Sequence, residues 1–160
     1  MEVVVRTARD LSTDALAPLV TESERSGWRF IRRLADDLRS AANRFDGPGE
    51  CLFVAESGGA VVGVCGLNAD PYRAGPAVGR VRRLYVLAAY RGGGVGRRLV
   101  QAVVSASAGH FRRLRVRTEN PQAGRLYERL GFVPVAGEAD CTHALELAEA
   151  EPIAAPNPAP

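Results

Sequence analysis

Four of the five residues from Gly92 to Gly96 are glycine, and they stand between a strand pattern at 78–87 and a helix pattern that follows. A strand that leads through a short loop into a helix implies a crossover, so the next strand, expected at 111–118, runs parallel to the first. Glycines at such a junction let backbone N–H groups approach an anion, because the helix N-terminus carries a partial positive charge. A tight turn with close helix packing is the alternative explanation. The fold therefore contains a parallel strand pair, and the loop that joins it is a candidate phosphate site.

The remaining elements follow from apolar periodicity and from turn residues. We predict strands at 2–9, 50–57, 60–68, 78–87, 111–118, 132–137 and 141–147, and helices at 12–26, at 28–45, from the glycine loop to Gly109, and from Asn120 to Gly131. Residues 46–49 are expected to stop the second helix. This order predicts an α/β fold with a mixed, largely antiparallel central sheet and helices on both faces. The domain would span 1–148, and the Ala/Pro-rich segment 149–160 is expected to be a disordered tail.

The positive charges are concentrated in the middle of the chain. All 21 basic residues are Arg, and residues 71–118 hold 11 of them with no Asp or Glu, although the net charge of the whole chain is only +3. Such a segment between acidic ends predicts a bound anionic partner. Because the chain has no Lys, an ordinary P-loop kinase or GTPase is excluded. No acidic residue follows the glycine loop before Glu119, which disfavours a dinucleotide enzyme.

Other classes are excluded by what the chain lacks. No apolar run approaches the roughly 18 residues of a membrane span, and the first residues do not resemble a signal peptide, so a cytoplasmic location is expected. Cys51, Cys65 and Cys141 form no C-x-x-C pair, which predicts neither a disulfide framework nor a metal site. Cys141 and His143 share a strand face, but no orienting carboxylate is evident for a thiol nucleophile.

Two ordered motifs resemble those of one family. The loop 91–96 reads R-G-G-G-V-G, similar to the R/Q-x-x-G-x-G/A signature of the GNAT superfamily of acyl-CoA N-acyltransferases. Residues 120–132 read N-P-Q-A-G-R-L-Y-E-R-L-G-F, similar to that family's N-x-x-A-x-x-L-Y-x-x-x-G-F. The resemblance covers roughly 3–147 and is specific over 78–132. It implies a GNAT-like fold and an N-acetyltransferase that uses acetyl-CoA.

The resemblance also implies how acetyl-CoA would bind. The cofactor would occupy a gap between the fourth and fifth strands, opened by a bulge near Val86. Strand backbone would pair with the pantetheine arm and polarise the thioester carbonyl, and loop N–H groups would hold the pyrophosphate. The expected cofactor-binding residues are Leu84, Tyr85, Val86, Arg91, Gly92, Gly93, Gly94, Val95, Gly96, Arg97, Asn120 and Tyr127.

The same resemblance assigns the chemistry to Tyr127, which would donate a proton to the departing CoA thiolate after direct attack by the amine. From its helical position alone, Tyr127 could equally be a core aromatic residue. The general base is not evident, because the fourth and fifth strands carry Arg and no carboxylate. Amine deprotonation could run through a water chain or through His143, Asp70 or Glu119, of which His143 is the favoured titrating group.

The acceptor is expected to be a small-molecule or peptide amine, and the acidic chain ends favour a cationic one. Candidate pocket residues are Trp28, Phe30, Arg33, Phe45, Asp70 and Tyr72. Two other functions compete. One is a CoA-binding module without turnover, which the missing carboxylate suggests. The other is a nucleic-acid-binding surface along Arg115 and Arg117, which the lack of stacking aromatic residues disfavours. A homodimer stays open.

Overall fold

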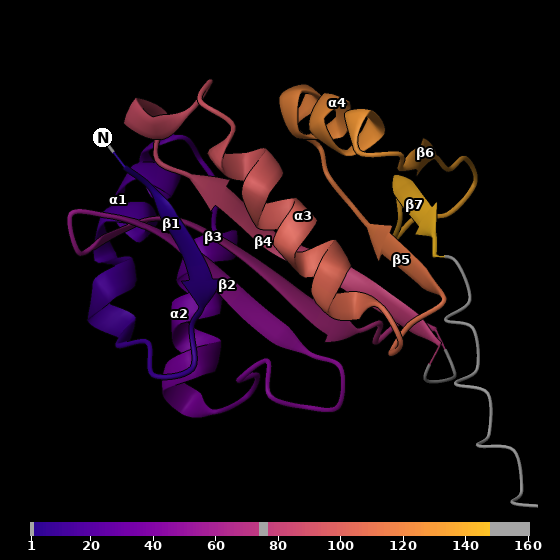
Figure 1. The fold of residues 1–160 in the computed structure, drawn as a ribbon, viewed down its shortest axis with the longest axis horizontal. Coiled ribbons are helices and arrows are strands. Elements are labelled where there is room, and N and C mark those ends of the chain that lie inside the picture. The colour runs from indigo at the N-terminus through magenta and orange to yellow at the C-terminus, as the bar shows by residue number, and fades with distance from the viewer. Residues whose placement is uncertain (1, 74–76, 148–160) are drawn as a thin grey trace, which may run out of the picture.

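A computed structural model describes residues 2–73 and 77–147 (Figure 1). In this part of the chain, seven strands form one sheet in the order β1-β2-β3-β4-β5-β7-β6. They are β1 Val4–Thr7, β2 Cys51–Ser57, β3 Ala60–Ala69, β4 Val78–Val86, β5 Arg113–Val116, β6 Val133–Pro134 and β7 His143–Glu146. Only β4 and β5 pair in parallel. The mixed, largely antiparallel sheet is thereby confirmed, and the tail predicted at 149–160 lies outside the described residues.

Helices cover both faces of the sheet, as expected. They are the 3₁₀ turns η1 Thr13–Leu16 and η2 Ala88–Tyr90, and the α-helices α1 Ala17–Arg25, α2 Phe30–Ser40, α3 Val95–Ser107 and α4 Pro121–Arg129. In Figure 1, α3 crosses the near face of the sheet, whereas α1 and α2 lie behind it. One apolar cluster joins α3 and α4 to the sheet, and a second joins α1 and α2 to the opposite face. None of the described helices is long and apolar enough to cross a membrane.

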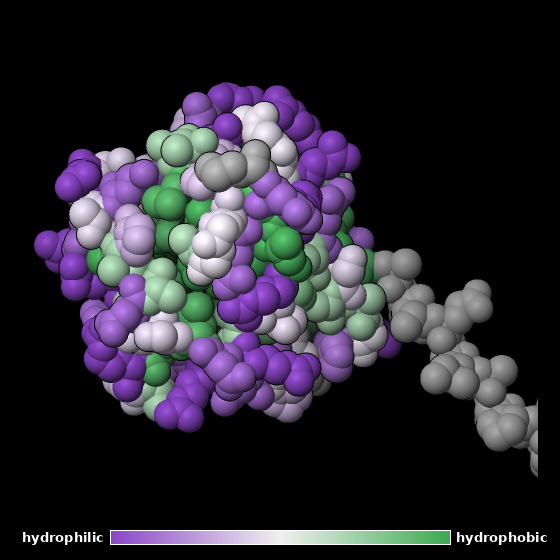
Figure 2. All heavy atoms as spheres, turned by 60° about the vertical axis from the view of Figure 1, so that its left-hand side comes forward, coloured by the Kyte–Doolittle hydropathy of each residue, from purple (hydrophilic) through white to green (hydrophobic). Residues whose placement is uncertain are grey.

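The surface is mostly hydrophilic on the side shown in Figure 2, where apolar side chains form patches between polar ones. The large hydrophobic residues that are well exposed in the described chain are Val4, Tyr72 and Val133, which belong to different elements. Single exposed apolar residues of this kind are ordinary for a protein surface. Tyr72 differs from the other two because it lies at the cavity described below.

The second helix ends earlier than predicted. The helix stops at Ser40, because Ala41 adopts a left-handed conformation with a φ of 63°. The following chain folds back onto the sheet, where Asn43 and Asn68 exchange two amide hydrogen bonds of 2.8 and 3.0 Å. Phe45 is then only 4% exposed, in the core rather than on the helix. The predicted stop at 46–49 is therefore wrong, because burial of Phe45 and the amide pair favour leaving the helix sooner.

The parallel strands β4 and β5 pair only at one end. Their ladder runs from Val78 to Arg80 on β4, opposite Arg113 to Arg115 on β5, and stops there. In the β3–β4 ladder, Gly66 pairs with Arg82 and Val64 pairs with Tyr85, so β4 has two residues where β3 has one. Arg83 lies in this bulge with a φ of 63°. A bulge bends a strand and increases its twist. The expected bulge is therefore present, but at Arg83 rather than near Val86.

Candidate functional site

A cavity of about 1200 Å³ opens where β4 and β5 separate. Its walls come from the α1–α2 connection, β4, the N-terminus of α3, the end of β5 and the first turns of α4. All the residues expected to bind the cofactor, except Gly93, line this cavity. Two motifs that are separate in the sequence thus contribute to one space.

The glycine loop leaves open space above its backbone. Gly92 and Gly94 have φ angles of 83° and 86°, which non-glycine residues rarely adopt. A Cβ atom on Gly92, Gly93 or Gly94 would meet nothing within 4 Å, whereas one on Gly96 would lie 3.3 Å from Leu126 Cδ2. Among these four glycines, close packing against a neighbouring helix therefore accounts for the glycine at position 96 only. Gly93 has neither a left-handed φ nor a close neighbour that requires glycine, so it leaves room for a bound group.

The N-terminus of α3 faces this space without a cap. Its N-cap residue is Gly94, no side chain accepts from the first turn, and no acidic residue lies in that turn. The first N–H groups of a helix have no intrahelical partner. Arg97 lies in the same turn, lines the cavity, and has no partner among the described residues. Backbone N–H groups and one mobile cation can therefore converge on an anion here.

Arg91 and Arg98 have other contacts. The Arg91 Nε donates to the carbonyl of Val86 at 2.8 Å, and its guanidinium lies 5.3 Å from the centre of the Tyr85 ring. Arg91 is thus held against β4 rather than free above the loop. The Arg98 Nη1 donates to the carbonyl of Val3 at 2.7 Å, on β1's side of the helix.

The backbone of β4 beyond the bulge is an unpaired edge. Leu84, Tyr85 and Val86 line the cavity, and the ladder to β5 has already ended at Arg80. An exposed strand edge can accept an extended ligand as an additional strand. Tyr85 itself is held by its hydroxyl, which donates to Glu22 Oε1 at 2.8 Å. Burial, with this hydrogen bond to Glu22, raises the pKa of Tyr85 to about 12.

Tyr127 reaches the same cavity from α4 and is 3% exposed. Its ring packs against Phe132 at 5.3 Å and against His143 at 6.3 Å between centroids. Burial raises the pKa of Tyr127 well above its ordinary value, so the phenol stays protonated. Asn120 lines the cavity as well, and its Oδ1 caps α4 by accepting from Gln122 N at 2.9 Å. Its amide N–H₂ remains available to a ligand.

The three residues considered as the general base, His143, Asp70 and Glu119, lie in different environments. His143 is not among the residues that line the cavity; its Nδ1 lies 2.9 Å from Thr142 Oγ1 and its Nε2 lies 3.7 Å from Glu128. The Asp70 side chain is fully enclosed and paired with Arg115. Glu119 is the carboxylate that does line the cavity among the described residues, and it pairs with Arg117 at 3.0 Å.

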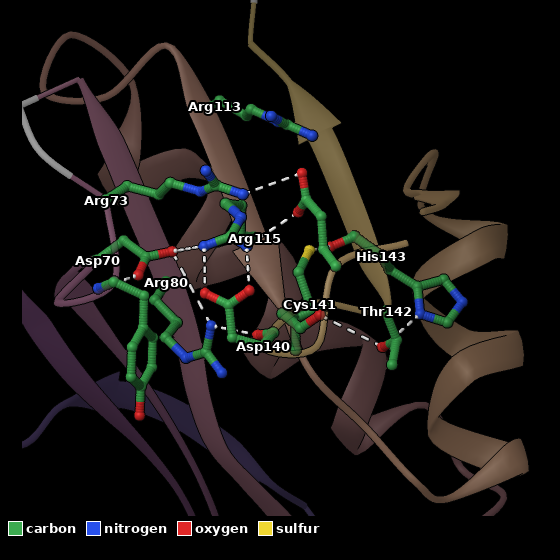
Figure 3. Close-up of polar contacts among 12 residues, drawn as sticks. Asp70, Arg73, Arg80, Arg113, Arg115, Asp140, Cys141, Thr142 and His143 are labelled. Atoms are coloured by element: carbon green, nitrogen blue, oxygen red, sulfur yellow. Dashed lines mark hydrogen bonds and ion pairs between the residues drawn. The ribbon is translucent and has the colours of Figure 1, made fainter. Parts of the chain in front are cut away.

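Sequence reasoning missed a charge cluster next to the paired ends of β4 and β5 (Figure 3). Arg115 is 0% exposed and donates to Asp70 at 2.7 Å, to Glu138 at 2.9 Å and to Asp140 at 2.9 and 3.2 Å. Burial alone would lower the pKa of Arg115, but the hydrogen bonds to these carboxylates raise it. The disfavoured alternative, a nucleic-acid-binding surface along Arg115 and Arg117, is therefore contradicted at Arg115, whose side chain is buried. The apolar neighbours Leu114 and Val116 were the available sign of a buried strand.

The part of the cavity lined by the start of α2 and by β4 is basic. Trp28, Phe30, Arg33 and Tyr72 line it as predicted, whereas Phe45 and Asp70 do not. The other charged residues there are Arg29, Arg80, Arg82 and Arg83. The notion of acidic chain ends near the acceptor finds no support among the described residues, because no carboxylate lines this part of the cavity and Glu138 and Asp140 pair with Arg115 instead.

Comparisons with known proteins agree with this geometry. A family model described as an acetyltransferase (GNAT) domain matches residues 48–134. N-alpha-acetyltransferase RimI of Mycobacterium tuberculosis is 38% identical over 78 residues, 49% of each chain, so the match spans about half the length of that curated relative. A candidate acetyltransferase from Exiguobacterium sp. 255-15 superposes with a TM-score of 0.79 and 31% identity, covering 91% of this chain and 94% of that one.

A more distant structure shares the fold alone. N-acetylglutamate synthase from Neisseria gonorrhoeae, solved with coenzyme A and N-acetyl-glutamate, is 18% identical with a TM-score of 0.68. The likeness covers 93% of this chain and 36% of that one.

Proposed function

Because the chain belongs to the GNAT acetyltransferase family, we propose that it transfers an acetyl group from acetyl-CoA to a primary amine. The observation that carries this proposal is the combination of the unpaired β4 edge and the open glycine loop in one cavity. The two features match the two chemically different parts of the cofactor. The edge suits an extended amide-containing arm, and the uncapped helix suits a pyrophosphate.

The cavity, the open glycine loop and the unpaired β4 edge fit acetyl-CoA. Loop N–H groups from Gly92 to Arg97 would hold the phosphates, and a Cβ on Gly92, Gly93 or Gly94 would meet no protein atom within 4 Å, so the loop leaves open space for them. Leu84, Tyr85 and Val86 would hold the pantetheine arm. The carbonyl of Val86 already accepts from Arg91, so the groups open to the cofactor are those of this stretch that the ladder to β3 does not use.

In the reaction, the amine nitrogen attacks the thioester carbon and the C–S bond breaks. The buried phenol of Tyr127 donates its proton to the leaving sulfur, which requires that it be protonated beforehand. Its raised pKa guarantees this at neutral pH. The attacking nitrogen loses its proton to water in the cavity, where Glu119 is the nearest lining carboxylate in the described chain. His143 is left out of this step because it packs behind Tyr127 and not on the cavity wall.

The competing functions are separated by two measurements. Isothermal titration with acetyl-CoA at moderate salt should show saturable binding, and absence of binding at millimolar cofactor would rule the proposal out. Release of CoA thiol with a panel of amines then distinguishes an enzyme from a binding module without turnover. The predicted cytoplasmic location and homodimer remain predictions.

A further inference from the structure

Five Arg side chains line the part of the cavity formed by β4 and the start of α2. Arg29 and Arg33 come from the start of α2, and the others from β4 around its bulge. The β4 members are Arg80, Arg82 and Arg83. In the described chain, no carboxylate lines this part, because Glu119 belongs to the segment after β5.

These charges are poorly balanced by the protein itself. No hydrogen bond or ion pair is formed by the side chains of Arg29, Arg33 and Arg82 with any described residue. Arg83 lies 3.8 Å from Asp37, and its buried Nε has no hydrogen-bond acceptor among the described residues. Arg80 lies 3.9 Å from Asp70 and is better held, because its Nη1 also donates to the carbonyl of Asp140 at 2.8 Å. Both ion pairs are too long for hydrogen bonds.

The guanidinium groups lie close enough to influence one another. Burial, followed by the charge of Arg82, lowers the pKa of Arg83 to about 10; Asp37 opposes this shift, and Arg33 adds to it. Converging like charges in a partly desolvated wall are unfavourable unless an anion joins them. The carboxylates that could have done so are already occupied, since Asp70 pairs with Arg115 at 2.7 Å.

The cofactor phosphates cannot be that anion. The loop that would hold them begins six residues after Val86, beyond the far end of β4. At a rise of about 3.3 Å per residue, Arg80 to Arg83 lie roughly 10–20 Å before Val86 along the same strand. The β4 members of the cluster therefore lie at the opposite end of the β4 edge from the glycine loop, with the expected position of the thioester between them.

We propose that the acceptor is an amine that also carries an anionic group, a carboxylate or a phosphate, which binds the guanidinium groups of Arg33 and Arg82. This inference rests on the proposed acetyl transfer and names its substrate class. Guanidinium presents paired N–H donors that match carboxylate and phosphate oxygens. Trp28 and Phe30, whose rings lie 6.1 Å apart, supply an apolar wall for the carbon chain between amine and anion.

Matched acceptor pairs test this directly. Each pair differs in the anionic group only: L-phenylalanine against phenethylamine, L-lysine against cadaverine, and phosphoethanolamine against ethanolamine. Because a hydrogen bond to a charged group contributes more than a neutral one, kcat/KM for the preferred anionic partner should be at least about tenfold higher. The first two pairs report on carboxylate and the third on phosphate. Equal or faster turnover of the uncharged partner in every pair would overturn the inference.

Variants separate anion recognition from structural support. In Arg82→Gln and Arg33→Gln, the ratio of kcat/KM for the anionic acceptor to kcat/KM for its uncharged partner should fall towards one, because KM for the anionic acceptor rises. The affinity for acetyl-CoA should not change. Arg25→Gln is the matched control, because Arg25 is exposed on α1 and is not among the cavity residues. Since Arg82 has no protein partner to lose, Arg82→Gln should unfold at the same or a higher urea concentration than the parent. A loss of stability with an unchanged acceptor preference would contradict the proposal.

Binding measurements test the proposed anion recognition even if no acceptor in the panel reacts. The protein saturated with CoA is titrated with N-acetyl-L-phenylalanine and, separately, with O-phosphoethanolamine, and Arg82→Gln should weaken whichever binds. If acetyl-CoA binds but neither acid binds nor reacts, the anion inference fails and the cofactor site stands. If acetyl-CoA itself does not bind, the proposed transfer fails, and the inference fails with it.

Discussion

The guanidinium of Arg115 and the carboxylate of Asp70 form an ion pair of 2.7 Å in which neither side chain is exposed. Asp70 follows β3, and Arg115 lies on β5 opposite Arg80 of β4, so the pair spans the intervening strand. It lies where β4 and β5 are still joined, next to the point at which they separate. The pair thereby ties together the strands whose divergence creates the cavity.

Asp70→Asn is expected to destabilise the protein by about 2–4 kcal/mol, because it leaves a buried guanidinium with less compensation. Arg115 would keep its hydrogen bonds to Glu138 and Asp140. The loss of stability should therefore be smaller than for a buried charge that has no partner at all. Urea unfolding measures it. Glu138→Gln is the control and should cost less, since Glu138 is 25% exposed and can be replaced by water. If both variants lost the same free energy of unfolding, burial of the Asp70–Arg115 pair would not explain the effect of Asp70→Asn.

Stability should fall at acid pH through the same cluster. Hydrogen bonds from Arg115 hold the pKa values of Glu138 and Asp140 below their usual range. The unfolded chain therefore takes up protons at higher pH than the folded one, so this contribution is complete above about pH 5 and is lost as pH falls through the folded values. Urea unfolding between pH 7 and 3 should show the decline. The decline should be shallower in the double variant Glu138→Gln, Asp140→Asn; an unchanged slope would contradict the assignment.

Tyr127→Phe should lower kcat roughly 100-fold, within the range of general acid catalysis. Acetyl-CoA affinity should change little, because the variant keeps the ring packed against Phe132. CoA thiol release measures the rate, and thermal unfolding checks that the fold is retained. Since the pKa of Tyr127 is raised well above its ordinary value, the parent rate should show no loss near pH 9 from ionisation of this phenol. A variant as fast as the parent would remove Tyr127 from the mechanism.

Gly93→Ala should weaken acetyl-CoA binding at least about tenfold, or roughly 1.4 kcal/mol, without destabilising the protein. A Cβ at this position meets no protein atom within 4 Å, so any penalty must come from the bound cofactor. Gly66→Ala is the converse control, because its Cβ would lie 2.5 Å from Phe45 Cε1 in the core. Isothermal titration and urea unfolding on both variants should show opposite effects. Undiminished binding by Gly93→Ala would place the phosphates elsewhere.

Much of the fold was predictable because its signals are local. The Gly58-Gly59 turn joins β2 and β3 as an antiparallel hairpin, as expected. Asn120 caps α4 and Pro121 opens it, and the strand–glycine loop–helix sequence around Gly94 produces the parallel pair. Each depends on the backbone preferences of a few neighbouring residues. Apart from Gly93, the residues predicted to bind the cofactor meet at one cavity for the same reason, since they lie in two contiguous motifs.

The distribution of charge was decided only by the tertiary structure. The sequence shows an Arg-rich middle and acidic ends, but not that Glu138 and Asp140 fold around Arg115, more than 20 residues away. Nor does it show that Arg82 lines the cavity without a side-chain partner among the described residues. Local patterns determine which segments become strands and helices, because backbone conformation depends on near neighbours. Which charges are neutralised depends on contacts between distant segments, and these contacts give the cavity the chemistry by which it would select its acceptor.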